Sequence, residues 1–254
     1  MFSSINALGK FTLYVLFIIS FNLNAADPKL TIKPIQNGVY EHISYQHVGQ
    51  WGNVAARGLV VVDGKEAYMI DTPWSNSDTE KLINWTKEQG FTLKTAVVTH
   101  FHQDASGGLT ALNQRNIPTY AYKKTNQLLE KHKGLSATHI IEEDKFSLLK
   151  DKIEVFYPGG GHTADNVVVW LEKPQILFAG CFVKGLNSKN LGNLEDARVS
   201  TWPTSIENTL SAYPNIKHVF PGHGRAGDKS LLLHTAKLAK NYLAEQNKLP
   251  VQGQ

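Results

Sequence analysis

The pattern of hydrophobic and polar positions predicts a strand-rich first third of the chain. Short stretches with near-alternating apolar side chains predict four strands, over residues 30–35, 39–46, 58–63 and 66–70. Asp63 and Gly64 separate the last two strands, and this dipeptide favours a two-residue hairpin turn. From residue 77 to residue 89 the spacing of apolar side chains such as Leu82 becomes helical, and Gly90 follows as a stop signal.

Strands and helices alternate through the rest of the chain. Apolar runs predict strands over 93–99, 152–157, 166–171, 176–178 and 218–220, and helical spacing predicts helices over 109–114, 125–133 and 229–246. Asp228 precedes the last helix as a capping residue. Strand-rich halves with intervening and terminal helices favour an α/β (α+β) fold, in which two sheets pack face to face and helices cover the outer faces.

The first 25 residues have the pattern of an export signal. Lys10 supplies a positive charge ahead of an apolar run, residues 11–19, that is too short to span a bilayer. Cleavage is expected after Ala25 or the alanine that follows it. We therefore expect residues 1–25 to be a signal peptide and residues 26–254 to form a single domain in the periplasm. The alternative is an uncleaved N-terminal anchor.

Composition narrows the functional classes. Of the 254 residues, 42% are hydrophobic and 19% are charged, which excludes a disordered chain because such chains lack the apolar surface that offsets ordering entropy. The formal net charge is only +4 and the lysines and arginines are scattered, so nucleic acid is not an expected partner. Cys181 is the only cysteine, which excludes an internal disulfide.

The strongest chemical signal follows the predicted strand that ends at Thr99. His100, His102 and Asp104 occupy alternate positions there, and in extended backbone residues two apart point the same way. A helix would separate the three side chains, so we expect extended backbone through Asp104. Imidazole and carboxylate donors gathered on one face suit zinc. The sequence therefore predicts a metal site after this strand.

Three further donors follow other predicted strands. His162, Cys181 and His223 each come after an apolar strand and next to glycine, which allows close backbone approach. Ligands in α/β architectures gather outside the carboxyl ends of strands, so all six donors can meet in one cleft. Six donors are too many for one tetrahedral zinc ion with an open position, but they divide into two sets of three. We expect two zinc ions per subunit, with a nucleophilic hydroxide between them, in a positively charged site that attracts anions.

The order of these donors resembles a known family. The His-x-His-x-Asp motif at residues 100–104, followed by His162, Cys181 and His223, resembles the metallo-β-lactamase superfamily and in particular the class B, subclass 1 enzymes. Further matches are Ile70-Asp71-Thr72-Pro73, residues 180–184 and residues 190–194. The resemblance implies a four-layer αββα sandwich with the site at one edge of the two sheets. It also assigns the ligands in two sets: His100, His102 and His162 for one zinc ion, and Asp104, Cys181 and His223 for the other.

The resemblance assigns further residues to catalysis and substrate binding. Lys184 matches a lysine that binds the substrate carboxylate, and Asn193 matches an asparagine near the lactam carbonyl. Residues 47–53 match a mobile hairpin loop in which Trp51 is the apolar contact with substrate. Asp104, Lys184 and Asn193 are accordingly the expected catalytic residues, Asp104 by orienting the hydroxide. Without the resemblance, Lys184 also fits a solvated lysine, Asn193 a turn residue and Trp51 half-buried scaffold.

The function implied by the resemblance is zinc-dependent hydrolysis of the β-lactam amide bond in penicillins, cephalosporins and carbapenems, which confers antibiotic resistance. The mature enzyme is expected to be a monomer with no membrane contact. Two alternatives remain open. One is another hydrolase of the same fold, such as a glyoxalase-type thioesterase, a lactonase or a phosphodiesterase, in which histidine commonly stands at Ala105 and a bridging carboxylate at Cys181. The other is a non-catalytic zinc-binding or zinc-delivery protein.

The remaining polar residues near these motifs are expected to have structural roles. Asp71 is expected beneath the site, where it orients a ligand loop through hydrogen bonds. Six other histidines are interpreted as surface residues or satisfied core residues: His42, His47, His132, His139, His218 and His234. Ala105 leaves the hydrogen bonding around Asp104 an open question.

Overall fold

The computed structural model describes residues 29–248. The predicted signal peptide, residues 1–25, lies outside the described residues. Within residues 29–248, no helix is both long enough and apolar enough to cross a membrane.

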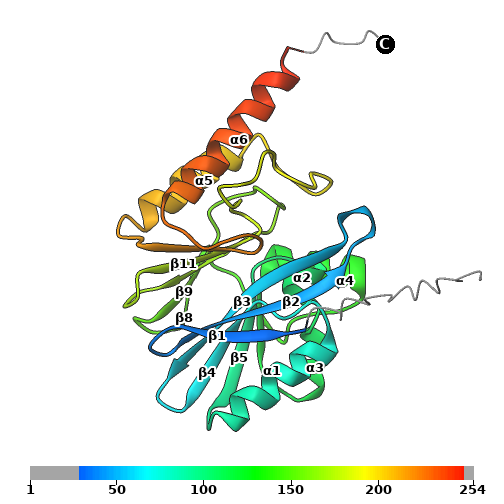
Figure 1. The fold of residues 1–254 in the computed structure, drawn as a ribbon, viewed down its shortest axis with the longest axis vertical. Coiled ribbons are helices and arrows are strands. Elements are labelled where there is room, and N and C mark those ends of the chain that lie inside the picture. Colours follow the sequence, from blue (N-terminus) through cyan, green and yellow to red (C-terminus); the bar gives the residue numbers. More distant parts are fainter. Residues whose placement is uncertain (1–28, 249–254) are drawn as a thin grey trace, which may run out of the picture.

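Seven strands form the first sheet, in the same order in space as in the sequence (Figure 1). They are β1 Thr31–Gln36, β2 Val39–His47, β3 Asn53–Asp63, β4 Glu66–Ile70, β5 Thr92–Val98, β6 Thr119–Tyr122 and β7 His139–Ile141. β1 to β4 pair antiparallel through short connections, and the predicted Asp63-Gly64 hairpin joins β3 to β4. From β4 to β7 the neighbours are parallel, so their carboxyl ends lie at one edge of the sheet.

Five strands form the second sheet, in the order β12-β11-β10-β9-β8. They are β8 Lys145–Leu149, β9 Ile153–Phe156, β10 Val168–Leu171, β11 Ile176–Gly180 and β12 His218–Pro221. Neighbours are antiparallel except for β11 and β12, whose parallel pairing brings their carboxyl ends together. β10 and β11 are buried along their whole length, which accounts for their unbroken apolar sequences.

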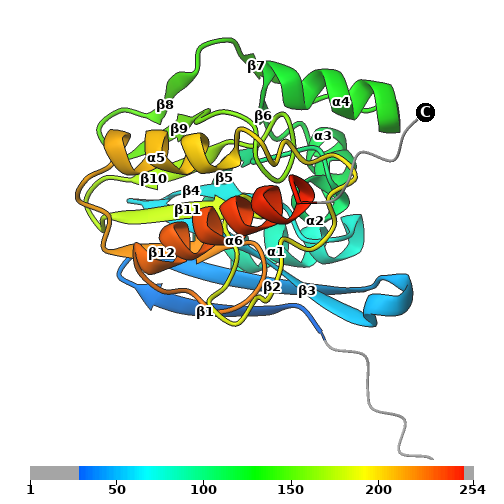
Figure 2. The same ribbon diagram turned by 90° about the horizontal axis from the view of Figure 1, so that it is seen from above.

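Helices cover the outer face of each sheet. They are α1 Asn76–Glu88, α2 Gln103–Ser106, α3 Leu109–Gln114, α4 Lys123–Lys133, α5 Trp202–Ala212 and α6 Ser230–Gln246. In Figure 1, α1 and α3 lie on the outer side of the seven-stranded sheet, and α5 and α6 lie on the opposite side of the molecule. Figure 2 shows α5 and α6 crossing over the strands of the five-stranded sheet. The predicted αββα sandwich is confirmed.

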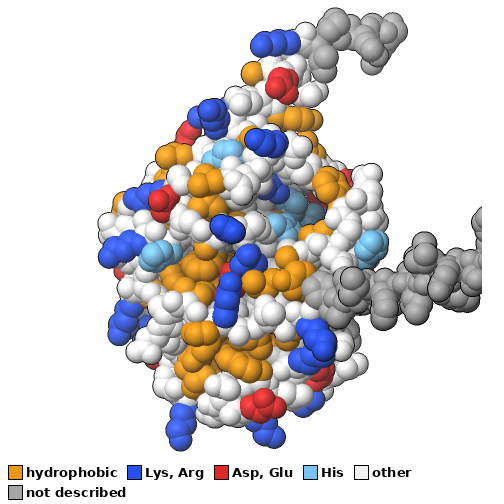
Figure 3. All heavy atoms as spheres, in the orientation of Figure 1, with side chains coloured by type: hydrophobic (Ala, Val, Ile, Leu, Met, Phe, Trp, Pro, Cys, Tyr) orange, Lys and Arg blue, Asp and Glu red, His pale blue; other side chains and the backbone are white. Residues whose placement is uncertain are grey.

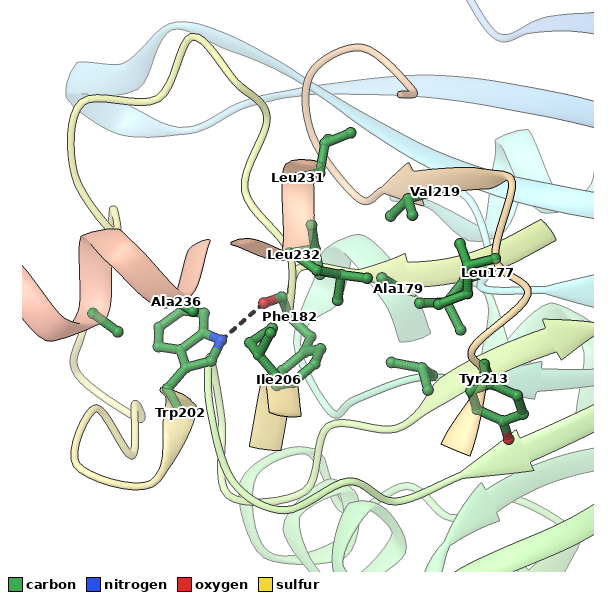
Figure 4. Close-up of a cluster of buried hydrophobic side chains, with 14 of the residues drawn as sticks. Leu177, Ala179, Phe182, Trp202, Ile206, Tyr213, Val219, Leu231, Leu232 and Ala236 are labelled. Atoms are coloured by element: carbon green, nitrogen blue, oxygen red, sulfur yellow. Dashed lines mark hydrogen bonds between the residues drawn. The ribbon is translucent and has the colours of Figure 1, made fainter. Parts of the chain in front are cut away.

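Apolar clusters hold the layers together. Val97 and Phe178 belong to the cluster between the two sheets, and Leu82 belongs to the one beneath α1. Beneath α5 and α6, the indole Nε1 of Trp202 donates to the carbonyl of Phe182 at 2.9 Å (Figure 4). Full burial of a valine, leucine or phenylalanine side chain stabilises the fold by about 1.5–3 kcal/mol. The layers are therefore firmly joined behind the edge that carries the ligand loops.

The structure differs from the sequence prediction mainly in its short elements. β3 begins at Asn53 instead of residue 58, because the whole of β2 pairs with it. The pairs run from His47 opposite Asn53 to Val39 opposite Val61. The sequence did not predict β6, β7, β8, α2 or α5. Apart from α5 Trp202–Ala212, these are segments of three to five residues, which contain too little pattern to be recognised, and pairing and packing with distant segments determine their conformation.

Candidate metal centre

Four loops at one edge of the sandwich contain the six predicted donors. The loop after β5 contains the His-x-His-x-Asp motif, and the loop after β9 contains His162. β11 leads directly into Cys181, and β12 leads through Gly222 into His223. The structure therefore brings together residues that are up to 123 positions apart in the sequence, between His100 and His223.

Three histidine rings converge in the first group. One ring nitrogen from each of His100, His102 and His162 lies within 4.8 Å of the others. Nδ1 of His102 and Nε2 of His162 are 3.2 Å apart, and Nε2 of His100 is buried without a hydrogen-bond partner. Buried polar atoms are normally hydrogen-bonded. A free buried nitrogen beside two other imidazole nitrogens is therefore the arrangement expected of a zinc site.

Asp104, Cys181 and His223 form the second group. Cys181 Sγ donates to Asp104 Oδ2 at 3.0 Å, and His223 Nε2 lies 2.9 Å from the same oxygen. Nδ1 of His223 donates a hydrogen bond to the carbonyl oxygen of Ala55 on β3 at 2.6 Å, and this contact orients Nε2 toward Asp104. His100, Asp104 and Cys181 also offer ligand atoms within 4.8 Å of one another, so the two groups are contiguous.

The second group combines a carboxylate with a protonated thiol. Burial raises the pKa of Asp104, but the neighbouring His100 and His223 rings outweigh burial and hold that pKa well below its usual range. Burial and the Asp104 charge raise the pKa of the Cys181 thiol well above its usual range. A divalent cation at this group would replace the thiol proton, because the thiolate is the metal ligand.

Asp71 supports the first histidine from beneath. Its carboxylate accepts a hydrogen bond from the Thr99 backbone N at 2.6 Å and another from Thr99 Oγ1 at 2.8 Å. Thr99 Oγ1 also lies 3.2 Å from Nδ1 of His100, the ring nitrogen opposite the one that faces the site. Asp71 therefore lies where the sequence analysis expected it and has the structural role predicted for it.

Two carboxylates beside the site were missed by the sequence analysis. Asp165 Oδ2 accepts a hydrogen bond from the Phe101 backbone N at 3.0 Å, and Asp196 Oδ2 lies 2.9 Å from Nε2 of His102. The Asp196 contact fixes the orientation of the His102 ring, and the Asp165 contact holds the backbone between His100 and His102. The only sequence signal for either was its position three residues after a residue already singled out.

The backbone through the motif is not extended to its end. His102 has extended dihedral angles, φ −64° and ψ 159°, but Asp104 lies in the first turn of α2. The prediction of extended backbone through Asp104 is therefore wrong. The helical turn directs the carboxylate toward Cys181 and His223, so a single five-residue motif contributes to both donor groups.

The sequence of this chain matches that of known proteins over most of its length. A family model described as the metallo-beta-lactamase superfamily matches residues 56–223. The chain belongs to the metallo-β-lactamase superfamily. A protein named "Metallo-beta-lactamase type 2" from Pseudomonas aeruginosa is 45% identical over 239 residues, which cover 94% of this chain and 96% of that protein. A protein of the same name from Bacteroides fragilis is 33% identical over 222 residues, covering 86% and 89%.

Solved structures show the same fold. The crystal structure of VMB-1 is 49% identical with a TM-score of 0.83, covering 85% of this chain and 98% of that one. The DIM-1 metallo-beta-lactamase is 44% identical with a TM-score of 0.82, covering 85% and 99%. The predicted fold and the predicted metallo-β-lactamase are thus confirmed, and zinc-dependent β-lactam hydrolysis is supported at the level of the family.

This metallo-β-lactamase has a cleft of about 390 Å³ beside the two donor groups, lined by Trp51, Lys184 and Asn193 among others. Histidine side chains gather in a hollow on the face shown in Figure 3. Trp51 ends the short 3-10 helix Gly49–Trp51 at the tip of the β2–β3 hairpin, and its side chain is 62% exposed. The three residues predicted to contact substrate therefore border the same cleft as four of the predicted metal ligands: His102, Asp104, His162 and His223.

Lys184 and Asn193 are held differently within the cleft. The Lys184 backbone N donates to Thr235 Oγ1 on α6 at 2.8 Å, and its Nζ lies 5.6 Å from the centre of the Trp202 ring. Burial lowers the pKa of the Lys184 ammonium. Asn193 Oδ1 accepts a hydrogen bond from the Glu195 backbone N at 3.1 Å, which is a turn-forming contact. Asn193 therefore stabilises a turn, which is one of the two roles that the sequence analysis left open, and it also borders the cleft.

Ala105 is buried in α2, and a cation approaches this helix from another element. Lys133, the last residue of α4, donates from Nζ to Ser106 Oγ at 2.8 Å and lies 3.4 Å from Gln103 Oε1. Burial lowers the pKa of Lys133 to about 8. The nearby Asp104 charge has the opposite effect on this pKa but is the weaker of the two. A lysine from α4 therefore makes polar contacts with the first and last residues of α2, the helix that contains Asp104.

Proposed function

We propose that this chain opens the β-lactam ring of penicillins, cephalosporins and carbapenems with two zinc ions held by its six donor residues. The observation that carries the proposal is the convergence of those donors, from four loops, beside a cleft that contains a lysine. The names of the relatives, metallo-beta-lactamase type 2, support the substrate class.

The donor chemistry fits zinc in both groups. In the first group, burial lowers the pKa of both His102 and His162, so both rings offer neutral nitrogens as zinc ligands. The second group offers a carboxylate, a thiol and an imidazole, which are common zinc ligands. Three protein ligands per ion leave a coordination position open in each group, as catalytic zinc sites require and as a closed delivery site would not.

The residues around the zinc ions have separate tasks. When bound, the zinc ions polarise the lactam carbonyl and lower the pKa of a water molecule so that it is nucleophilic near neutral pH. Asp104 can orient that water by accepting its hydrogen bond, because its carboxylate lies between the two groups. Oδ2 contacts His223 of the second group, and Oδ1 lies 3.4 Å from His100 Nε2 of the first. The oxygen of water adds to the carbonyl carbon, the carbon–nitrogen bond breaks, and the nitrogen takes up a proton.

The cleft residues bind the parts of the substrate that do not react. The Lys184 ammonium binds the substrate carboxylate, because burial at the cleft strengthens its attraction for an anion. The exposed Trp51 indole covers apolar parts of the substrate, and the Asn193 amide contacts the lactam carbonyl. Hydrolases of the same fold that use a bridging carboxylate are disfavoured by Cys181, which occupies that place with a thiol in contact with Asp104.

A spectroscopic assay of the purified mature protein tests the proposed function. Nitrocefin and imipenem should be hydrolysed, EDTA should abolish hydrolysis and added zinc should restore it. Elemental analysis should find two zinc ions per chain. Cleavage of a thioester without cleavage of either lactam would favour the glyoxalase-type alternative, and tight zinc binding without any turnover would favour a zinc-binding protein.

We also propose that residues 1–25 direct export and are then removed, which leaves residues 26–254 as a monomeric single-domain enzyme in the periplasm. Lys10 and the short apolar run that follows support this proposal. Intact mass measurement of protein from the periplasmic fraction should show an N-terminus at residue 26 or 27, and gel filtration should give the monomer mass. Full-length protein in the membrane fraction would instead indicate an uncleaved anchor.

A further inference from the structure

His42 reaches across the seven-stranded sheet toward the ligand loops. Its ring belongs to β2, is 1% exposed and lies over Gly58 of β3, its register partner. A Cβ atom at Gly58 would lie 2.2 Å from His42 Nε2 and 2.6 Å from the carbonyl oxygen of Ile70, which is too close for any other residue. The missing side chain at position 58 lets the ring pass over β3 to the end of β4.

The polar contact of this ring is with Asp71, the residue after β4. His42 Nε2 lies 3.1 Å from the Asp71 carbonyl oxygen, and since a carbonyl only accepts, Nε2 carries the proton. Nδ1 is then an acceptor, buried without a hydrogen-bond partner. Burial lowers the pKa of His42 to about 4, so the ring is neutral near neutral pH. Because an unpaired buried nitrogen is unfavourable, an apolar side chain would suit a purely structural position better.

Asp71 connects this contact to the metal centre. Its φ of 55° lies in the left-handed region, which is unfavourable for a residue other than glycine. From this conformation the Asp71 carboxylate accepts both hydrogen bonds of Thr99, whose hydroxyl contacts Nδ1 of His100. The following residue, Thr72, donates from N and Oγ1 to the Ala105 carbonyl at 2.8 and 3.0 Å. The turn at Asp71 therefore contacts both ends of the ligand motif.

We propose that His42 is a positioning residue of the metal centre. Its Nε2–H holds the Asp71 carbonyl and thereby the left-handed turn, and Thr99 transmits this position to His100 so that Nε2 of that ring faces the metal. The inference rests on the proposed function only in requiring that His100 bind a metal ion. His42 itself contacts neither metal nor substrate.

Zinc affinity of the metal-free protein, measured by competition with a chromophoric chelator, tests the inference. His42→Phe keeps a ring but removes the donor. Because His42 acts on the ligand through Asp71 and Thr99, this substitution should weaken zinc binding by about 10-fold, the lower end of the effect of losing a direct outer partner of a ligand. His42→Gln can place an amide N–H at a similar reach from Cβ and should stay within about threefold of wild type by the same reasoning. The Co(II) absorption spectrum should change in His42→Phe and be restored in His42→Gln.

Val39→Ala is the matched control, because Val39 lies on the same strand within the core between the sheets. It should lower the melting temperature without altering zinc affinity or the Co(II) spectrum. Zinc affinity in His42→Phe equal to wild type, or an equal loss in His42→Gln and His42→Phe, would overturn the inference. Failure of the wild type to bind zinc would overturn the proposed function as well, so the two failures are distinguishable.

A double-mutant cycle with Thr99→Val provides a second test. If His42 acts through Thr99, the losses of zinc affinity in the two single variants should not add in the double variant. Additive losses would overturn the inference. Should His42→Phe fail to fold, the NMR resonance of the His42 Nε2 proton in the wild type replaces it: the resonance should shift when zinc is added, and an unchanged resonance would count against the inference.

Discussion

The two sheets each contribute three of the six donors, but they hold them in different ways. The seven-stranded sheet supplies its three from one segment after β5: His100, His102 and Asp104. The five-stranded sheet supplies one from each of three separate loops: His162, Cys181 and His223. Each donor group combines ligands from both sheets, so neither sheet contains a complete group of its own.

The means of support also differ between the sheets. Beneath the seven-stranded sheet's motif lies a chain of buried hydrogen bonds through Asp71 and Thr99. In the five-stranded sheet, close backbone packing dominates: a Cβ atom at Gly222 would lie 2.7 Å from Cys181 Sγ, and one at Gly161 would lie 2.7 Å from the Phe182 ring. A hydrogen-bonded support can be weakened one contact at a time, whereas close packing of this kind does not tolerate any added side chain.

The largest effect is expected from His162→Ala, which removes the five-stranded sheet's contribution to the three-histidine group. Catalytic efficiency, kcat/KM, should fall by more than about 100-fold, since losing only an outer partner of a ligand already costs about 10–100-fold. Steady-state kinetics with nitrocefin measures this. His218→Ala, an exposed histidine on the same sheet, is the control and should retain wild-type kinetics. Comparable activity in both variants would show that the five-stranded sheet contributes nothing to the first group.

Removal of zinc should lower the stability of the fold, because each donor group joins the two sheets. At a free zinc concentration about a thousand times the dissociation constant, binding adds about 4 kcal/mol to the free energy of unfolding. For a chain of this size, that corresponds to a melting temperature about 8–16 °C higher than with EDTA. Differential scanning calorimetry with zinc or EDTA measures the shift. The same shift in His162→Ala as in the wild type would contradict a site that spans both sheets.

Acid pH should weaken the support beneath the seven-stranded sheet. Unfolded His42 takes up a proton near pH 6.5, whereas the buried ring does so only near its lowered pKa of about 4. Unfolded chains therefore bind more protons as pH falls from 6.5 to 4, and His42 lowers the free energy of unfolding by about 3 kcal/mol over this range. Urea denaturation of metal-free protein at several pH values measures it. His42→Gln should lack this part of the pH dependence, and identical slopes would contradict a neutral buried ring.

A smaller effect is expected from Lys184→Ala, which leaves both donor groups intact. KM for carboxylated lactams should rise by about tenfold or more, because a hydrogen bond to a charged group contributes about 1.5–3 kcal/mol. The kcat should change little, since the contact is made before and during the reaction alike. Lys189→Ala, an exposed lysine in the following loop, is the control. An unchanged KM would remove Lys184 from the substrate site.

The sequence predicted what is encoded locally. The donors at residues 100–104 and the strand ends before Cys181 and His223 were recognisable because apolar runs and motif spacing lie within a few neighbouring residues. The structure brings the six donors together, and their assignment to two zinc ions stays a prediction. The sandwich itself followed from the alternation of strands and helices together with the family resemblance.

What the sequence did not predict depends on contacts between distant segments. Asp196 and His102 are 94 positions apart, and Asp165 and Phe101 are 64 apart, so no local pattern marks either carboxylate. His42 was interpreted as a surface or satisfied core residue, because nothing near it in the sequence shows that it reaches Asp71, 29 positions away, over a glycine. The helical turn at Asp104 was missed because a four-residue helix carries no recognisable period.

The division of ligands between the sheets also bears on the order of events during biosynthesis. The first half of the chain contains the whole His-x-His-x-Asp motif, yet its neighbours in each donor group come from residues 162, 181 and 223. A nascent polypeptide therefore lacks the three-histidine group until His162 is in place, and it lacks the second group until β12 has docked beside β11. We accordingly expect the second group to bind its metal ion last, once tertiary assembly is finished.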